Sequence, residues 1–104
     1  MTKIINLTPH EINIVGEQTI NIPPSGQIAR VVEKIGNIGD VNGIPLIHKT
    51  FGKVEGLPEP QTDTIFIVSL LVAQATHRTD ILAIGETVRN EKGQVVGAKS
   101  FAMV

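Results

Sequence analysis

Side chains branched at Cβ dominate this sequence and constrain it to a sheet-based fold. The 104 residues include fifteen Ile, eleven Val and nine Thr. These side chains are stiff at χ1 and fit a pleated sheet better than a helix. The only aromatic residues are three Phe. We therefore expect a mainly β domain whose core is built from aliphatic side chains.

The length, charge and cysteine content of the chain exclude several classes of protein. A chain of 104 residues forms one domain, which we expect to span 1–104. The formal net charge of −1 argues against a general nucleic-acid binder, which needs a basic surface. The absence of Cys excludes disulfides, a thiolate nucleophile and a zinc knuckle. No apolar run is long enough for a membrane helix, and because the first residues lack the apolar stretch of a signal peptide, we expect no secretion signal.

Short apolar and alternating segments predict strands in the first half of the chain. The polar–apolar alternation over 11–22, around a turn at Gly16, predicts a β-hairpin. Residues 35–43 hold three Gly and two Asn and are predicted as a loop or a second small hairpin. Pro45 restricts its strand to an edge or a strand start. The predicted strands of this half cover 3–7, 11–15, 19–22, 27–34 and 44–51.

The second half contains the most apolar strand and the one convincing helix. Residues 64–68 form the most apolar strand segment of the chain and predict a central strand buried on both faces. Ser69 is a favoured helix N-cap, and the good helix formers that follow predict a helix of about two turns over 70–76. The Pro- and Gly-rich residues 52–63 predict an extended connection. Further predicted strands cover 80–84, 87–89 and 94–101, the last two joined by a four-residue turn.

Six to eight short strands with one helix are typical of the α+β class, mainly β. We expect an antiparallel sheet, or a small barrel or sandwich of short strands, with the short helix directly after the central strand.

Two turns offer backbone amides to an anion. Ser25 and Gly26 end the rigid segment 22–26 and could cradle a phosphate, or they could simply connect two strands. Ser69 stands where free N–H groups of a helix start would favour an anion, although a plain helix cap explains it as well. Its neighbours are too bulky for a nucleophile elbow.

Arginine and histidine supply the remaining candidate ligand-binding groups. Arg78 could fork onto a phosphate with Asp80 orienting it, and Arg30 could converge with it in a local basic pocket. Alternatively, each arginine is a solvated or paired surface residue. His10 follows Pro9 at a strand break, where its ring could meet a ligand or bond a local backbone group.

The pattern does not favour catalysis, a metal or a cofactor. His48 and His77 lack a partner at the spacing typical of metal sites, and neither G-x-G-x-x-G nor a P-loop occurs. We therefore expect no catalytic residues, no cofactor and no metal. Because a pocket of several hundred Å³ forms more easily between subunits of this size, we expect a homo-oligomer.

An ordered set of short motifs runs through nearly the whole chain. Together they are Asn6-Leu7-Thr8-Pro9-His10, Ile22-Pro23-Pro24-Ser25-Gly26, Ala29-Arg30-Val31, Gly56-Leu57-Pro58-Glu59-Pro60, Ile67-Val68-Ser69, Leu71-Val72-Ala73, Arg78-Thr79-Asp80 and Val88-Arg89-Asn90. This set resembles a family of small phage, prophage and actinobacterial proteins. The family has no assigned catalytic residues, so the resemblance transfers none.

The resemblance implies a phage context and a cytoplasmic location in a bacterial host cell. By analogy with phage counter-defence proteins, it implies a sponge that sequesters an ADP-ribose-like immune signal, as in anti-Thoeris factors, without turnover. The partner would be a phosphate-containing small molecule, held by Ser25, Ser69, Arg30 and Arg78, with no nucleic acid and no membrane. The alternative is a small structural or protein-interaction protein, such as a virion component or an inhibitor, that acts through a sheet edge.

Overall fold

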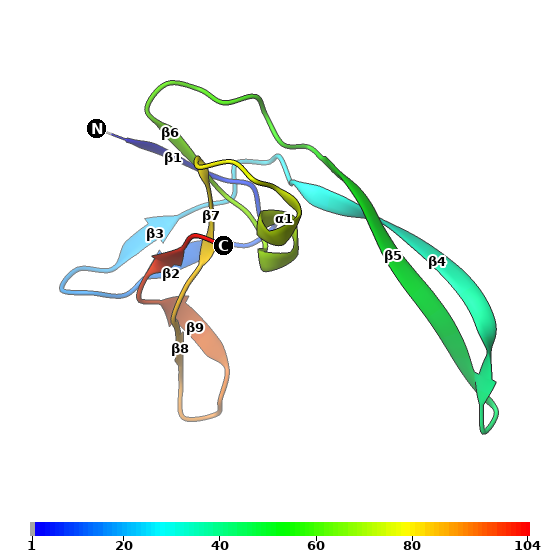
Figure 1. Cartoon of the computed structure of the whole chain (residues 1–104). Coiled ribbons are helices and arrows are strands. Elements are labelled where there is room, and N and C mark those ends of the chain that lie inside the picture. The colour runs from blue at the N-terminus through cyan, green and yellow to red at the C-terminus, as the bar shows by residue number, and fades with distance from the viewer. Residues whose placement is uncertain (1) are drawn as a thin grey trace.

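Three small sheets and one helix organise residues 2–104, the part of the chain that the computed structural model describes (Figure 1). Strands take up 50% of the chain and helix 6%. The predicted α+β, mainly β class is therefore confirmed. The strands of the described residues do not close into a barrel.

The first sheet has the order β1-β6-β7-β10 and contains the most buried strand. Strand β6 lies between two parallel neighbours, as its apolar sequence predicts. The short helix α1 makes the crossover from β6 to β7, which a parallel pair requires. The sheet is thus mixed, with β10 antiparallel to β7. Its elements are β1 (Lys3–Asn6), β6 (Thr64–Ile67), α1 (Leu70–Ala75), β7 (Ile81–Ile84) and β10 (Phe101–Ala102).

The second sheet joins the two predicted hairpins. Its order is β3-β2-β9-β8, with antiparallel β2–β3 and β8–β9 pairs. The two hairpins meet where Ile14 of β2 lies opposite Ala98 of β9. A Cβ on Gly97 would stand 2.9 Å from the carbonyl oxygen of Asn13, so glycine permits this close approach. The strands are β2 (Ile12–Ile14), β3 (Ile20–Ile22), β8 (Thr87–Arg89) and β9 (Val95–Ala98).

The third sheet is a long hairpin, which we call the arm: β4 (Arg30–Val41) and β5 (Ile44–Glu55) (Figure 1). The sequence predicts a strand ending near residue 34 and a loop or small hairpin over 35–43. Instead the strand continues to the turn at Asn42 and Gly43, and β5 extends into the predicted connection as far as Glu55. The turn residues have φ of 51° and 81°, the type I′ signature of an Asn-Gly hairpin.

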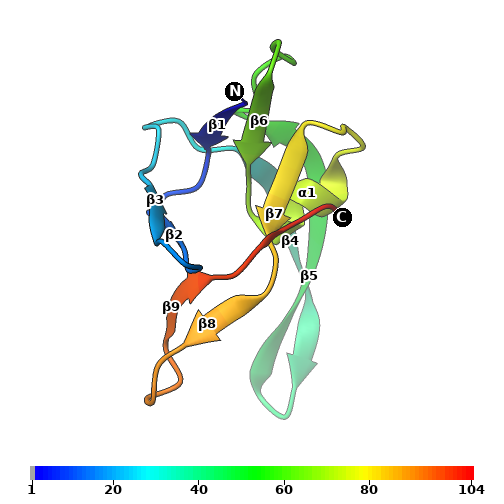
Figure 2. The same ribbon diagram turned by 90° about the vertical axis from the view of Figure 1, so that its left-hand side faces the viewer.

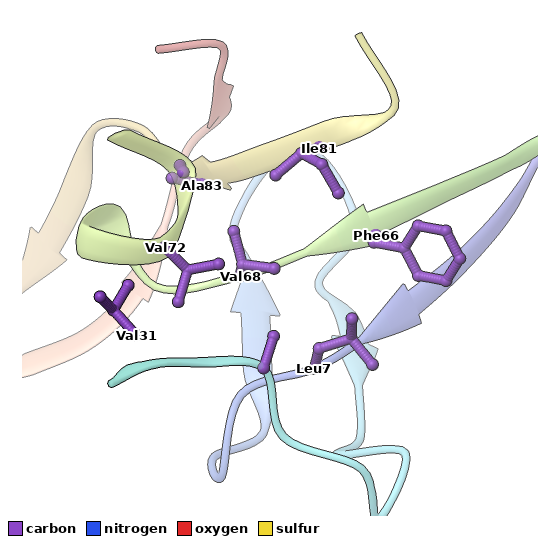
Figure 3. Close-up of a cluster of buried hydrophobic side chains, with 9 residues drawn as sticks. Leu7, Val31, Phe66, Val68, Val72, Ile81 and Ala83 are labelled. Atoms are coloured by element: carbon purple, nitrogen blue, oxygen red, sulfur yellow. The ribbon is translucent and has the colours of Figure 1, made fainter. Parts of the chain in front are cut away.

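The core lies where β6 and α1 meet the base of the arm (Figure 3). Phe66 and Val68 are 0% and 1% exposed, and Val72 of α1 packs in the same cluster. Ser69 caps α1 as predicted, since its side chain accepts a hydrogen bond from the Val72 amide at 3.4 Å. A helix of six residues is stable only through such packing. This core fixes the body of the molecule and the root of the arm.

Candidate functional site

Arg78 and Asp80 form a bidentate ion pair just before β7. Arg78 Nε donates to Asp80 Oδ1 at 2.9 Å, and Nη2 donates to Oδ2 at 2.6 Å. The remaining nitrogen, Nη1, donates to the carbonyl oxygen of Pro58 at 2.8 Å. The guanidinium also lies 5.9 Å from the centre of the Phe66 ring. The pair therefore ties the Pro-rich connection 56–60 to the first sheet.

The mutual hydrogen bonds lower the pKa of Asp80 and raise the pKa of Arg78. Burial opposes both changes but is the smaller effect. The predicted partnership of these residues is present. Three of the five guanidinium N–H groups of Arg78, however, already donate within the chain, which leaves a phosphate only one N–H on each Nη atom.

Asn6, which sequence reasoning passes over, organises the loop that carries His10. Its side chain is buried, and Nδ2 donates to the carbonyl oxygens of His10 at 2.7 Å and Ile22 at 3.1 Å. Oδ1 accepts from the Thr8 amide at 2.9 Å and the Thr8 hydroxyl at 2.6 Å. This is an Asx turn, and an Asn two residues before a Thr-Pro pair was the available signal. Asn6 thus joins the 8–10 loop to the end of β3.

Ser25 and Gly26 form a connection between strands, in agreement with the simpler of the two interpretations. The Ser25 amide donates to the Asn6 carbonyl at 3.0 Å, and the Ser25 hydroxyl exchanges hydrogen bonds of 3.3 Å with the backbone of Gln27. Gly26 has φ of 94°, which favours glycine. Both residues are exposed. Arg30 begins β4 nearby, opposite Glu55 in the strand register.

His10 and Ser69 line one cavity of about 630 Å³. Its wall is formed by the 8–11 loop, β2 and β9 on one side, and by the ends of β6 and β7 with the start of α1 on the other. Figure 2 shows these two groups of strands facing each other. The structure thus brings together two of the seven predicted residues at the cavity. Arg78 and Asp80 pair elsewhere, and Ser25, Gly26 and Arg30 also lie outside its lining.

The chemical character of the cavity is apolar. Apolar residues predominate in its lining, namely Pro9, Ile12, Val68, Leu70, Ala83, Ile84, Val95, Val96 and Ala98. Within the described residues, no Arg or Lys lines it, and Glu11 contributes a carboxylate. Such a wall suits an apolar side chain better than a phosphate, which needs cationic or amide donors.

The arm carries the second unusual surface. Seven large apolar side chains along it are 42–68% exposed: Ile35, Ile38, Val41, Ile44, Leu46, Ile47 and Phe51. Cross-strand partners point to the same face and successive residues alternate. The register therefore places Ile35, Ile47 and Phe51 on one face. Val41, Ile44 and Leu46 share the opposite face.

The arm also gives the molecule an extended shape. The radius of gyration is 16.6 Å, against about 13 Å for a compact domain of this length. The accessible surface is 7450 Å², against about 5,700 Å² for a compact monomer of 11.2 kDa. Roughly 1,750 Å² of surface is therefore exposed beyond what the mass of the chain explains.

In comparisons with protein-family models, curated protein sequences and solved structures, no match to this chain was found. The resemblance to the phage family accordingly stays a prediction.

Residues 2–104 also bear on two other features, a metal site and a membrane-spanning helix. No cluster of three or more His, Asp or Glu side chains in this part of the chain could hold a metal ion. No helix in this range is long and apolar enough to cross a membrane.

Proposed function

We propose that this chain is an assembly protein that associates with further copies of itself through the arm. The observation that carries the proposal is a hairpin with twelve residues in each strand and apolar side chains exposed on both faces. A two-stranded ribbon is at best marginally stable in water without a third strand or a covering surface. Both of its strands are edges, with a row of backbone groups open to another chain.

The charges of the arm favour association with a second copy of the chain over a partner whose surface charge has only one sign. Acidic and basic side chains are mixed along it in nearly equal number, three acidic (Glu33, Asp40 and Glu55) and four basic (Arg30, Lys34, Lys49 and Lys53). A nucleic acid or an acidic membrane surface would require a basic excess. A mixed-charge surface instead allows copies of one chain to pack without mutual repulsion.

The exposed area has the size that association requires. A standard interface buries about 800 Å² on each partner. The surplus of roughly 1,750 Å² on this chain therefore matches about two such surfaces. This agrees with the alternative function predicted from the sequence, a structural or interaction protein that acts through a sheet edge.

Sedimentation velocity over a range of concentrations tests the proposal. We expect the wild type to sediment as an oligomer. The variant Ile35→Thr/Ile44→Thr/Ile47→Thr, which removes apolar side chains from both faces of the arm, should weaken association at least about 100-fold. Threonine keeps the β propensity of the strands. The control variant Ile4→Thr/Ile20→Thr/Met103→Thr removes three exposed apolar side chains outside the arm. Equal weakening by both variants, or a wild-type monomer at about 100 µM, would contradict the proposal.

Nucleotide sequestration remains the other prediction from the sequence. Its support is the volume of the cavity and the presence of His10 and Ser69 in its lining. The carboxylate of Glu11 and the pairing of Arg78 with Asp80 weigh against it. A thermal-shift screen with ADP-ribose derivatives and cyclic nucleotides decides between the two: stabilisation by several degrees at micromolar ligand would favour sequestration over assembly.

A further inference from the structure

The cavity and the tip of the arm are two apolar surfaces that the same monomer leaves uncovered. Around the cavity mouth, Leu70, Val95 and Val96 are 56%, 55% and 46% exposed. At the far end of the arm, Val41 and Ile44 are exposed to a similar degree. Large exposed apolar patches mark interaction sites. Each surface therefore needs a partner.

The tip of the arm is narrow enough to enter a cavity. The two-residue turn at Asn42 and Gly43 is the narrowest end that a hairpin can have. Val41, Ile44 and Leu46 lie on one face behind it, and Gly39 stands opposite Leu46 without a side chain of its own. The cavity of about 630 Å³ is large enough for several aliphatic side chains.

The arm cannot reach the cavity of its own chain in this conformation. It leaves the body beside α1 and runs outward, away from the sheet formed by β2 and β9 (Figure 1). Only another copy can therefore bring its tip to the cavity.

We propose that the arm tip of one copy inserts into the cavity of the next, so that the chains assemble head to tail. This inference rests on the proposed function and specifies its geometry. In a head-to-tail arrangement every copy uses two surfaces, one on its arm and one at its cavity. Two surfaces of about 800 Å² account for the surplus of roughly 1,750 Å², whereas an arm-to-arm dimer uses one and leaves the cavity open. A contact of this kind closes into a ring or continues as a filament.

The absence of native cysteine allows a clean cross-linking test. Ile44→Cys marks the tip, Val96→Cys marks the cavity mouth, and Ile20→Cys on β3 is an exposed control position outside the cavity. The single-cysteine proteins are mixed in pairs under conditions where the wild type is oligomeric, and treated with a short bis-maleimide. We expect an Ile44→Cys/Val96→Cys dimer at least about tenfold more abundant than the Ile44→Cys/Ile20→Cys dimer.

The outcomes separate this inference from the proposed function. A dimer formed by Ile44→Cys alone, without the pair to Val96→Cys, would show an arm-to-arm contact and overturn the head-to-tail arrangement while leaving self-assembly intact. An oligomer that gives none of these dimers would overturn it as well. A wild-type monomer in sedimentation would overturn both.

A surface substitution gives a second readout that does not depend on cross-linking. Val96→Lys places a charge at the exposed cavity mouth, where the folded monomer tolerates it, and Ile20→Lys is its control. We expect Val96→Lys to dissociate the oligomer with an unchanged melting temperature of the monomer. An oligomer that withstands Val96→Lys as well as Ile20→Lys would contradict insertion at this cavity.

Discussion

Asn6 shows how one buried polar side chain can position a whole loop. It satisfies four hydrogen-bonding groups of the chain around it, and it is only 1% exposed. Buried polar groups that lose a partner cost more than the bond itself contributes, because the abandoned group has no water to replace it. The 8–10 loop, and with it one wall of the cavity, therefore depends on Asn6.

Replacing the Asn6 side chain should strongly destabilise the fold. We expect Asn6→Ala to lower the free energy of unfolding by about 2–4 kcal/mol, since it removes the side-chain donor to the carbonyl oxygen of Ile22 and one of the two side-chain donors to that of His10. Urea denaturation followed by circular dichroism measures the change. Asn21→Ala, at an exposed position of β3, is the control and should cost less than about 1 kcal/mol. Similar losses for both variants would show that Asn6 has no special role.

The Arg78–Asp80 pair predicts a dependence of stability on pH. Because the pKa of Asp80 is lower in the folded than in the unfolded state, its ionised form stabilises the fold above the unfolded-state pKa. That contribution is lost as the pH falls through the folded-state pKa. We therefore expect the stability difference between wild type and Asp80→Asn to be largest near pH 7 and to shrink in acid below pH 4. A difference that is constant from pH 7 to pH 2 would exclude the pair as its cause.

At the residue scale, the sequence predicted contacts that are local and not those that are distant. The Ser69 cap depends on a residue three positions away, and the partnership of Arg78 with Asp80 on one two positions away. The bond from Arg78 to Pro58 spans twenty residues and has no sequence signal. The same holds for the bond from Asn6 to Ile22. Long-range partners such as the Pro58 carbonyl leave no local pattern in a sequence, so Arg78 has fewer N–H groups free for a ligand than its sequence alone indicates.

At the scale of elements, the arm departs most from prediction. Residues 35–43 are rich in Gly and Asn, which usually indicate a loop. Here only Asn42 and Gly43 form the turn, whereas Gly39 lies next to an irregularity in the ladder with φ of 135°. Glycine at a bulge inside a strand and glycine in a turn give the same composition. The apolar residues that continue on both sides of these glycines indicate the long strands better than the Gly and Asn content indicates a loop.

The connection that follows the arm begins at a glycine where a side chain would clash with the backbone. Gly56 has φ of 79°, and a Cβ there would overlap the carbonyl oxygen of Ile28. Gly93 provides a matched control, because it has φ of 80° in open space. We expect Gly93→Ala to cost about 1 kcal/mol of unfolding free energy through backbone strain alone. Gly56→Ala should cost at least about 2 kcal/mol more, because a clash with backbone is added. Equal losses in thermal or urea denaturation would contradict the close approach.

At the scale of the whole molecule, the sequence predicted the class and not the arrangement. The first short hairpin was predicted from polar–apolar alternation, the second from its four-residue turn and the central strand from its apolar run, and the structure confirms all three. The parallel pairing of β1 with β6 joins segments about sixty residues apart, which local patterns do not encode. The outward path of the arm is likewise a property of the assembled fold. The aliphatic-rich composition predicts a buried core. Because the arm projects outward, however, seven of its large apolar side chains are exposed.

Hydrogen–deuterium exchange at two protein concentrations tests the central claim, that further copies of this chain cover the arm. A two-stranded ribbon that nothing covers should exchange its ladder amides rapidly. The account predicts that amides of β4 and β5 exchange at least about tenfold more slowly in a concentrated, oligomeric sample than in a dilute one, while those of β6 are unchanged. Equal exchange of the arm at both concentrations would contradict it.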